Sequence, residues 1–145
     1  MSELWRKSAV ELAAMIRCRE VSSREVVQAH LDRVEAVNPQ LNAVVRLLPE
    51  QALAAADAAD RAVADGTGLG PLHGVPFTVK ENIDLAGTPT TQAVPALAEA
   101  VAPVDAPQVE RLRAAGGALG GTVVADHPRK PRPARSWAAG LFVRS

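Results

Sequence analysis

The side chains with the clearest potential for chemistry lie around one short apolar run in the middle of the sequence. Lys80 ends this run, Glu81 follows it directly, and His73 comes shortly before it. A histidine can act as a general base, but one in a loop before Gly-Val-Pro is expected to be structural or to face solvent. Glu81 and Asp84 are expected to be loop groups, or groups that support the site without touching substrate, rather than acid–base catalysts. From its position alone, Lys80 is a strand-end lysine whose amine extends to water.

Residue types that hold metals, cofactors or disulfides are sparse. The single cysteine, Cys18, excludes an intramolecular disulfide and a Cys-rich metal site. Its place in a helical pattern predicts a packing thiol rather than a nucleophile. His30, His73 and His127 are scattered, so no metal site is expected. Glycines in 66–70 lack the strand–turn–helix setting of a dinucleotide-binding loop, and no cofactor is expected.

Composition predicts a folded body and a tail of different character. The chain has 145 residues, close to one domain, and 48% of them are hydrophobic. All 16 acidic residues lie at or before Asp126, whereas five of the 16 basic residues follow it. Residues 1–126 therefore carry eleven basic and 16 acidic side chains. The basic tail could contact phosphates, but the acidic body would repel them, so no nucleic-acid partner is expected.

The start of the chain and its apolar runs bear on its location. The sequence contains no apolar run of about 18 residues, and no basic start followed by an apolar segment. Neither a membrane span nor export is therefore expected. A reducing cytoplasm is the simplest compartment for a chain with one cysteine.

Two short amphipathic helices are predicted at the start of the chain. Ser8 and Glu11 have the spacing of a capping box, in which each side chain bonds to the backbone N–H of the other residue. Ser22 and Glu25 repeat this spacing before a second apolar stripe. Asn38-Pro39 is expected to end the second helix, because the residue before a proline disfavours the helical conformation.

The rest of the body alternates between predicted strands and helices. Strands are predicted at 41–47, 75–80 and 118–125, and helices from Pro49 to about residue 64 and from Asp105 to residue 115. The middle strand is expected to be buried on both faces, as in a mostly parallel sheet. This alternation predicts an α/β fold. Because three strands are few for a sheet with both faces covered, an incomplete sheet is expected.

The sequence around Lys80 resembles the lysine-bearing region of the amidase signature family. The similar residues are Gly70–Asp84, with the sequence Gly-Pro-Leu-His-Gly-Val-Pro-Phe-Thr-Val-Lys-Glu-Asn-Ile-Asp, and then Gly87-Thr-Pro-Thr-Thr-Gln92. The preceding elements and the later segment Asp105–Gly116 occur in the family's order, so the resemblance covers about residues 4–116. It implies the N-terminal part of the family's mixed-sheet α/β fold, incomplete here, with two N-terminal helices.

The resemblance also implies a reaction, the hydrolysis of a carboxamide C–N bond through an acyl-enzyme. The family uses a Ser–cis-Ser–Lys triad, and Lys80 matches its catalytic lysine. Neutral lysine takes a proton from the cis-serine, which activates the nucleophilic serine. A lysine can do this only where burial lowers its pKa from about 10.4 towards neutrality. Phe77 and Val79 are expected to supply that desolvating setting.

The resemblance ends after Gly117, where the family continues towards a Gly- and Ser-rich segment that carries both serines. Ser136 and Ser145 are the only serines after Lys80, and neither lies in such a segment. We therefore expect a family member truncated before both serines and inactive alone. The chain is expected to divide into an amidase segment, 1–117, and a divergent basic Pro/Arg-rich tail, 118–145, which is out-of-frame or disordered.

Three functions remain open at this stage. The leading one is an amidase that acts on a small-molecule amide. A second is the amidase subunit of the glutamyl-tRNA amidotransferase, and a third is a non-enzymatic interaction or nucleic-acid-binding fragment that uses the basic tail. Thr88, Thr90 and Thr91 either line an active-site entrance or make turn hydrogen bonds.

Overall fold

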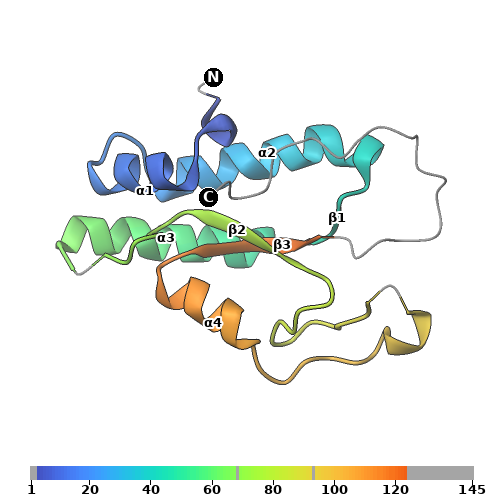
Figure 1. Ribbon diagram of the computed structural model, residues 1–145. Coiled ribbons are helices and arrows are strands. Elements are labelled where there is room, and N and C mark those ends of the chain that lie inside the picture. Colours follow the sequence, from blue (N-terminus) through green and yellow to red (C-terminus); the bar gives the residue numbers. More distant parts are fainter. Residues whose placement is uncertain (1–2, 68, 93, 124–145) are drawn as a thin grey trace.

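The computed structural model describes residues 3–67, 69–92 and 94–123, which form helices around a small sheet (Figure 1). The helices are α1 (Ala9–Arg17), α2 (Ser23–Leu41), α3 (Pro49–Asp65) and α4 (Pro107–Ala114), with 3-10 turns at Leu4–Arg6 and Pro95–Leu97. The strands are β1 (Val44–Leu47), β2 (Pro76–Lys80) and β3 (Ala118–Val123). The predicted α/β fold and its two N-terminal helices are confirmed. Most of the predicted tail, residues 124–145, lies outside the described residues, so the predicted division of the chain stays a prediction.

The three strands form one mixed sheet in the order β1-β3-β2. β3 runs parallel to β2, where Lys80 is the partner of Val123, and antiparallel to β1. In the described sheet β2 therefore has a strand neighbour on one edge only. Val79 is its one buried residue, three others are half-buried, and Lys80 is exposed. The prediction that this strand is buried on both faces was wrong for the described residues, whose side chains cover β2 only in part.

Both predicted capping boxes are present. In α1 the Ser8 N–H donates to Glu11 Oε2 at 2.8 Å, and the Glu11 N–H donates to Ser8 Oγ at 3.2 Å. Ser22 and Glu25 repeat the pair at the start of α2, at 2.8 and 3.0 Å. The backbone N–H of each serine, followed by its hydroxyl, holds the pKa of the partner glutamate below its ordinary value. Each helix start is thus fixed by residues local in sequence.

The end of α2 differs from the prediction, since the helix continues through Pro39 to Leu41. Pro39 removes one helical hydrogen bond, because it has no N–H to donate to the carbonyl of residue 35. The Asn38 side chain then organises the exit: it accepts from the Val44 N–H at 2.8 Å and donates to the Val44 carbonyl at 2.9 Å. Asn42 ends the helix in the left-handed conformation, with φ of 50°. The chain therefore turns directly from α2 into β1.

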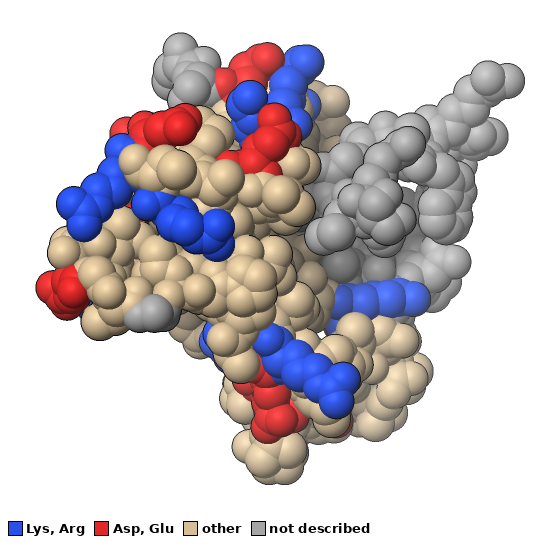
Figure 2. All heavy atoms as spheres, turned by 60° about the vertical axis from the view of Figure 1, so that its left-hand side comes forward, with Lys and Arg blue, Asp and Glu red and all other residues tan. Residues whose placement is uncertain are grey.

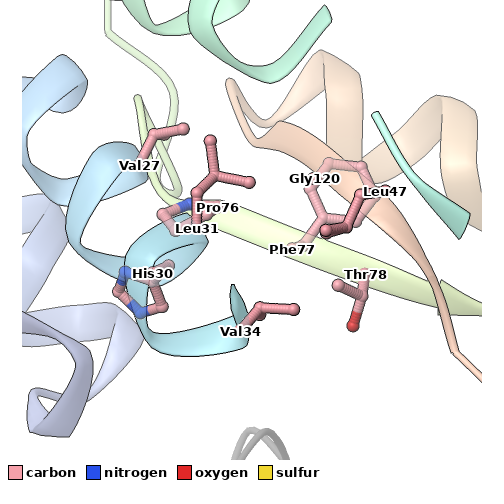
Figure 3. A pocket seen from close by; sticks show the side chains of 9 residues that line it. All are labelled: Val27, His30, Leu31, Val34, Leu47, Pro76, Phe77, Thr78 and Gly120. Atoms are coloured by element: carbon pink, nitrogen blue, oxygen red, sulfur yellow. The ribbon is translucent and has the colours of Figure 1, made fainter. Parts of the chain in front are cut away.

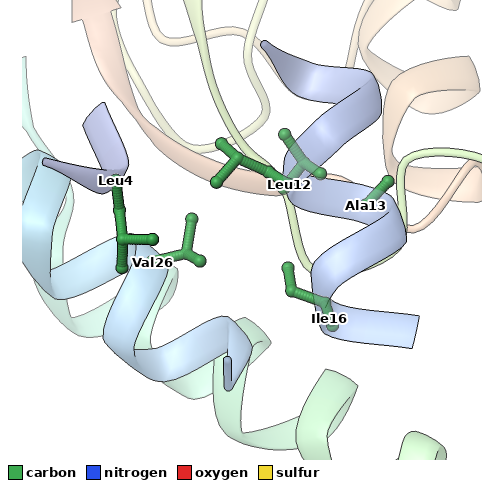
Figure 4. Close-up of a cluster of buried hydrophobic side chains, with 6 residues drawn as sticks. Leu4, Leu12, Ala13, Ile16 and Val26 are labelled. Atoms are coloured by element: carbon green, nitrogen blue, oxygen red, sulfur yellow. The ribbon is translucent and has the colours of Figure 1, made fainter. Parts of the chain in front are cut away.

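One hydrophobic cluster joins the N-terminal elements to the start of β2 (Figure 4). Its buried members come from the first 3-10 turn, α1, α2 and the residue before β2: Leu4, Leu12, Ala13, Ile16, Val26 and Val75. Next to it, the buried Ser23 hydroxyl donates to the Gly74 carbonyl at 2.7 Å. The beginning of α2 is thereby fastened to the beginning of β2.

The two faces of the sheet pack differently. On one face α3 approaches β3 through small residues, so that Ala52 and Ala56 contact Ala118 and Val27 of α2. The other face packs α4 and the loop after β2 through larger side chains, which are Val79, Leu85, Val109 and Leu119. Ala118 and Leu119 are consecutive in β3 and serve opposite faces, as strand geometry requires.

α3 also secures the start of α2. Proline occupies its first turn, and Gly66 ends it in the left-handed conformation, with φ of 67°. Within α3, the Asp60 carboxylate accepts from the backbone N–H groups of Ser23, at 2.6 Å, and Arg24, at 3.1 Å. These are orphan donors of the first turn of α2, so a side chain far away in sequence completes the cap.

Charged side chains of both signs share the surface shown in Figure 2. Several are paired, among them Arg24 with Asp57 at 2.6 Å and Lys7 with Glu11 at 3.6 Å. This mixed surface gives no support to the nucleic-acid alternative, whose basic tail lies outside the described residues. Within residues 3–123, no helix is both long and apolar enough to cross a membrane.

Candidate active site

Lys80 is the last residue of β2, at the strand's carboxyl end. Val79 before it is 5% exposed, but Phe77 is half-buried and the Lys80 side chain is exposed. The expected desolvating setting is therefore not formed by the part of the chain that the structure describes. The described elements leave the side chain of the last residue of β2 open to solvent.

Glu81 directly follows Lys80 and Asp84 comes three residues later, and each carboxylate accepts a hydrogen bond from a threonine of the same loop. The Thr91 hydroxyl donates to Glu81 Oε1, and the Thr90 hydroxyl donates to Asp84 Oδ1 at 2.7 Å. Glu81 and Asp84 thus make contacts within the loop, and the prediction that neither is an acid–base catalyst stays a prediction. The part of the loop that contains Thr90 and Thr91 is therefore hydrogen-bonded to residues that closely follow the lysine.

The threonines make turn hydrogen bonds, which was one of the two predicted roles. The buried Thr88 hydroxyl donates to the Leu85 carbonyl at 2.9 Å. The backbone then pairs with residues further along: the Thr90 N–H donates to the Ala100 carbonyl at 3.1 Å, and the Ala102 N–H donates to the Thr88 carbonyl at 3.0 Å. The loop is therefore an ordered, hydrogen-bonded structure. The other predicted role, lining an active-site entrance, stays a prediction.

Asp105 has a role that the sequence did not reveal. It was expected only to begin a helix, but the first residue of α4 is Pro107 and no side chain caps that helix. Instead, Asp105 Oδ1 accepts from the Ala86 N–H at 2.8 Å, and Oδ2 accepts from Arg113 Nε at 2.8 Å. The carboxylate thereby links the loop after Lys80 to α4. The signal in the sequence is an acidic residue just before a Pro-initiated helix, which does not indicate a distant partner.

His73 is structural, as predicted. Its side chain is buried, and Nε2 lies 2.9 Å from the Ala59 carbonyl of α3. Gly116 packs against the His73 backbone so closely that an added Cβ would lie 2.8 Å from the His73 Cα. These contacts hold the segment before β2 between α3 and the end of α4, so His73 is a support of the strand rather than a base.

An apolar cavity of about 40 Å³ lies between α2 and the sheet (Figure 3). It is lined by side chains of α2, β1 and β2 and by one residue of β3: Val27, His30, Leu31, Val34, Leu47, Pro76, Phe77, Thr78 and Gly120. His30 Nδ1 lies 2.8 Å from the Val26 carbonyl, and burial lowers the pKa of the imidazole. Sites for small molecules are about 300–1,000 Å³, so this cavity is too small for an amide substrate.

A more open hollow of about 270 Å³ lies where α1, α2 and α3 meet. Its charged groups already have partners: Arg19 donates to the Val63 carbonyl at 2.7 Å, and Asp60 accepts from the first turn of α2. Nearby Cys18 is exposed, contrary to the predicted packing thiol, because it follows the last turn of α1. Within residues 3–123, no three His, Cys, Asp or Glu side chains are grouped to hold a metal.

Comparisons with known proteins agree on one family. The profile of the Amidase family matches residues 25–126, whereas the expected resemblance covered 4–116. The indoleacetamide hydrolase of Bradyrhizobium diazoefficiens is 54% identical over 113 residues, which cover 78% of this chain and 22% of that protein. A glutamyl-tRNA(Gln) amidotransferase subunit of Acidothermus cellulolyticus is 47% identical over 116 residues, 80% of this chain and 23% of that protein.

Solved structures give the same result. A bacterial aryl acylamidase of the amidase signature family superimposes with a TM-score of 0.78 and 31% identity, over 84% of this chain and 26% of that chain. The described fold thus has a counterpart in a much longer enzyme. This chain spans about a quarter of the length of the relatives it matches.

Proposed function

The chain belongs to the amidase signature family, and we propose on this basis that it contributes the catalytic lysine, Lys80, to the hydrolysis of a carboxamide C–N bond. One observation carries the proposal. Lys80 ends β2 within the Gly-Val-Pro-Phe-Thr-Val-Lys block, inside the region that matches the family profile. A lysine at the carboxyl end of a strand is fixed at its backbone while its amine can reach a reacting group.

The proposed chemistry is proton transfer. The neutral amine of Lys80 takes a proton from a bridging serine, and that serine takes one from the nucleophilic serine. The nucleophile attacks the amide carbonyl, the proton returns from Lys80 through the bridging serine to the nitrogen of the leaving group, and the C–N bond breaks. Water then gives a proton to the same relay and releases the acyl group from the serine. Both serines belong to a Gly- and Ser-rich segment that this sequence does not contain. Lys80 is therefore the only member of the triad here, and we expect the chain alone not to turn over substrate.

The exposure of Lys80 sets a requirement on the rest of the site. An amine acts as a base near neutral pH only where its ammonium form is disfavoured by removal from water. The described residues leave the Lys80 side chain exposed. We infer that the segment carrying the serines also covers the end of β2, so that the base becomes functional only when that segment is present.

The proposed substrate is a small carboxamide. Sequence identity is higher to the indoleacetamide hydrolase, at 54%, than to the amidotransferase subunit, at 47%. This difference favours an amidase that releases ammonia or an amine over a subunit of a tRNA-dependent complex. An acylamidase of Rhodococcus erythropolis, 43% identical, is a further relative of the same kind.

A chimera tests the proposal. Residues 1–123 replace the matching N-terminal part of the Bradyrhizobium indoleacetamide hydrolase, and release of ammonia from indole-3-acetamide is measured. We expect the chimera to hydrolyse the amide and Lys80→Ala to lower kcat by about 10²–10⁴-fold, the range for loss of a general base. Lys7→Ala, which alters another exposed lysine, is the matched control and should leave kcat unchanged.

Two results would contradict the proposal. If the Lys80→Ala chimera kept its rate within a few-fold, Lys80 would not be the base. If the 145-residue chain alone hydrolysed amides and lost this activity in Lys80→Ala, a nucleophile outside the family pattern would be present.

A further inference from the structure

The segment after Lys80 is acidic, and three of its acidic side chains accept hydrogen bonds within the fold. Between Lys80 and Arg111 the sequence has five acidic residues and no basic one. Glu81 and Asp84 accept hydrogen bonds from threonines of the loop, and Asp105 accepts from Ala86 and Arg113. These carboxylates therefore organise the loop.

Asp105 joins the end of this loop to its beginning. Its two oxygens bind donors on opposite sides, the Ala86 N–H and Arg113 Nε, each at 2.8 Å. The neighbouring Ala106 N–H donates to the Asp84 carbonyl at 2.9 Å. The Asp105 side chain is 14% exposed, whereas that of Arg113 is 40% exposed. Two of these bonds, Asp105 Oδ1 with the Ala86 N–H and the Ala106 N–H with the Asp84 carbonyl, hold the first residues of the loop next to the start of α4. We call this pair of bonds the clamp.

The clamp determines where the rest of the loop lies. Beyond the clamp, the Gly87 N–H donates to the Ala102 carbonyl at 2.9 Å, and Pro89 pairs with Val101 in an antiparallel bridge. This pairing folds the chain back, so that the Thr91 hydroxyl reaches Glu81, the residue next to Lys80. A series of hydrogen bonds within the loop thus runs from Asp105 to Glu81, the residue next to Lys80.

We propose that Asp105 is a positioning residue for Lys80, which acts by holding the loop that borders the lysine against α4. The inference rests on the proposed function, because positioning matters to catalysis only if Lys80 takes a proton. It assigns Asp105 no contact with substrate. The Asp105 side chain fixes the position of the loop, and the position of the loop determines the surroundings in which the Lys80 amine reacts.

The test uses the 145-residue chain and two local measurements. Amide hydrogen exchange is followed by NMR at Ala86, with Val26 of the N-terminal core as reference. Acetylation of the Lys80 amine by acetic anhydride is followed by mass spectrometry relative to Lys7. We expect Asp105→Ala to speed exchange at Ala86 about tenfold, the effect of one lost charge-assisted hydrogen bond. The Lys80 labelling rate should change by about twofold or more, while Val26 is unaffected.

Matched variants separate the clamp from general stability. Arg113→Gln removes the ion pair but leaves the Asp105–Ala86 bond, and should preserve most of the protection at Ala86. Asp105→Asn keeps an oxygen acceptor of lower strength, so exchange at Ala86 should rise by about threefold and Lys80 labelling should stay near wild type. If Asp105→Ala does not fold, Asp105→Asn decides the matter: no difference from Arg113→Gln at Ala86 would overturn the proposal.

Two further outcomes would overturn it for the alanine variant. Faster exchange at Val26 to the same degree as at Ala86 would mean that Asp105 serves stability alone. Unchanged Lys80 labelling despite a faster-exchanging loop would mean that the loop does not influence the lysine. Neither readout needs turnover, so failure of the proposed function, seen in the Lys80→Ala chimera, is distinguishable from failure of this inference.

Discussion

Replacement of Gly74 by alanine tests the contact that fastens α2 to β2. Gly74 has φ of 71°, and a Cβ there would lie 2.6 Å from Ser23 Oγ and 2.7 Å from Ser23 Cβ. The left-handed conformation costs an alanine about 1–2 kcal/mol. To relieve the contact Ser23 must move, and its buried hydrogen bond to the Gly74 carbonyl is then lost, at about 1–3 kcal/mol. We expect Gly74→Ala to lower the free energy of unfolding by about 3–4 kcal/mol.

Gly87 is a matched control for this prediction. Its φ of 77° is almost the same, but nothing lies within 4 Å of a Cβ placed there. Gly87→Ala should therefore cost only the conformational strain of about 1–2 kcal/mol. Urea denaturation followed by circular dichroism gives both values, and the difference of about 2 kcal/mol measures the contact with Ser23.

A double-mutant cycle completes the experiment. Ser23→Gly removes the two atoms closest to the new Cβ and leaves only Ile16 Cδ1, at 3.3 Å, so Gly74→Ala in that background should cost about as much as Gly87→Ala. Equal costs for Gly74→Ala and Gly87→Ala in the otherwise native chain would mean that the contact with Ser23 contributes nothing. The reasoning would also be refuted by a cost of Gly74→Ala that is unchanged in the Ser23→Gly background.

Two more predictions concern α2. Asp60→Ala should cost about 2 kcal/mol in urea denaturation, because it removes two backbone hydrogen bonds at the start of α2. Asp57→Ala, which breaks an ion pair with side chains 52% and 40% exposed, should cost less than about 1 kcal/mol, and an equal cost would contradict this account. Burial lowers the pKa of His30 below its ordinary 6.5, so the unfolded chain binds that proton more readily than the folded chain. Stability should therefore fall as the pH drops below about 6.5, and His30→Gln should weaken this dependence in urea midpoints measured between pH 7.5 and 5.5; the same slope in both proteins would count against it.

Features set by neighbouring residues could be predicted from the sequence. The capping boxes at Ser8 and Ser22 depend on a spacing of three residues, and both are present. Proline in the first turn of α3 and glycine after its end mark that helix correctly. The resemblance around Lys80 also indicated the family that the profile match shows.

Features set by distant contacts could not be predicted. The end of α2 depends on Asn38 bonding to β1, which outweighs the local signal of Pro39. The exposure of Lys80 depends on which elements cover the end of β2, and the residues of the strand itself do not show this. Asp105 binds an amide 19 residues away, although its position suggested only a helix start. In each case the deciding partner lies on another element.

The position of β3 in the sheet has a consequence for the order of folding. In the described sheet both strand pairs involve β3, which is the last of the three strands to be synthesised. Val44 pairs with Val123, which is synthesised much later, and such non-local pairing is slow to form. The capped helices α1 and α2 can form early from local contacts, whereas β1 and β2 stay without a strand partner during synthesis. The nascent chain therefore exposes two unpaired strands until its final described segment emerges, a period in which it is open to association with other chains.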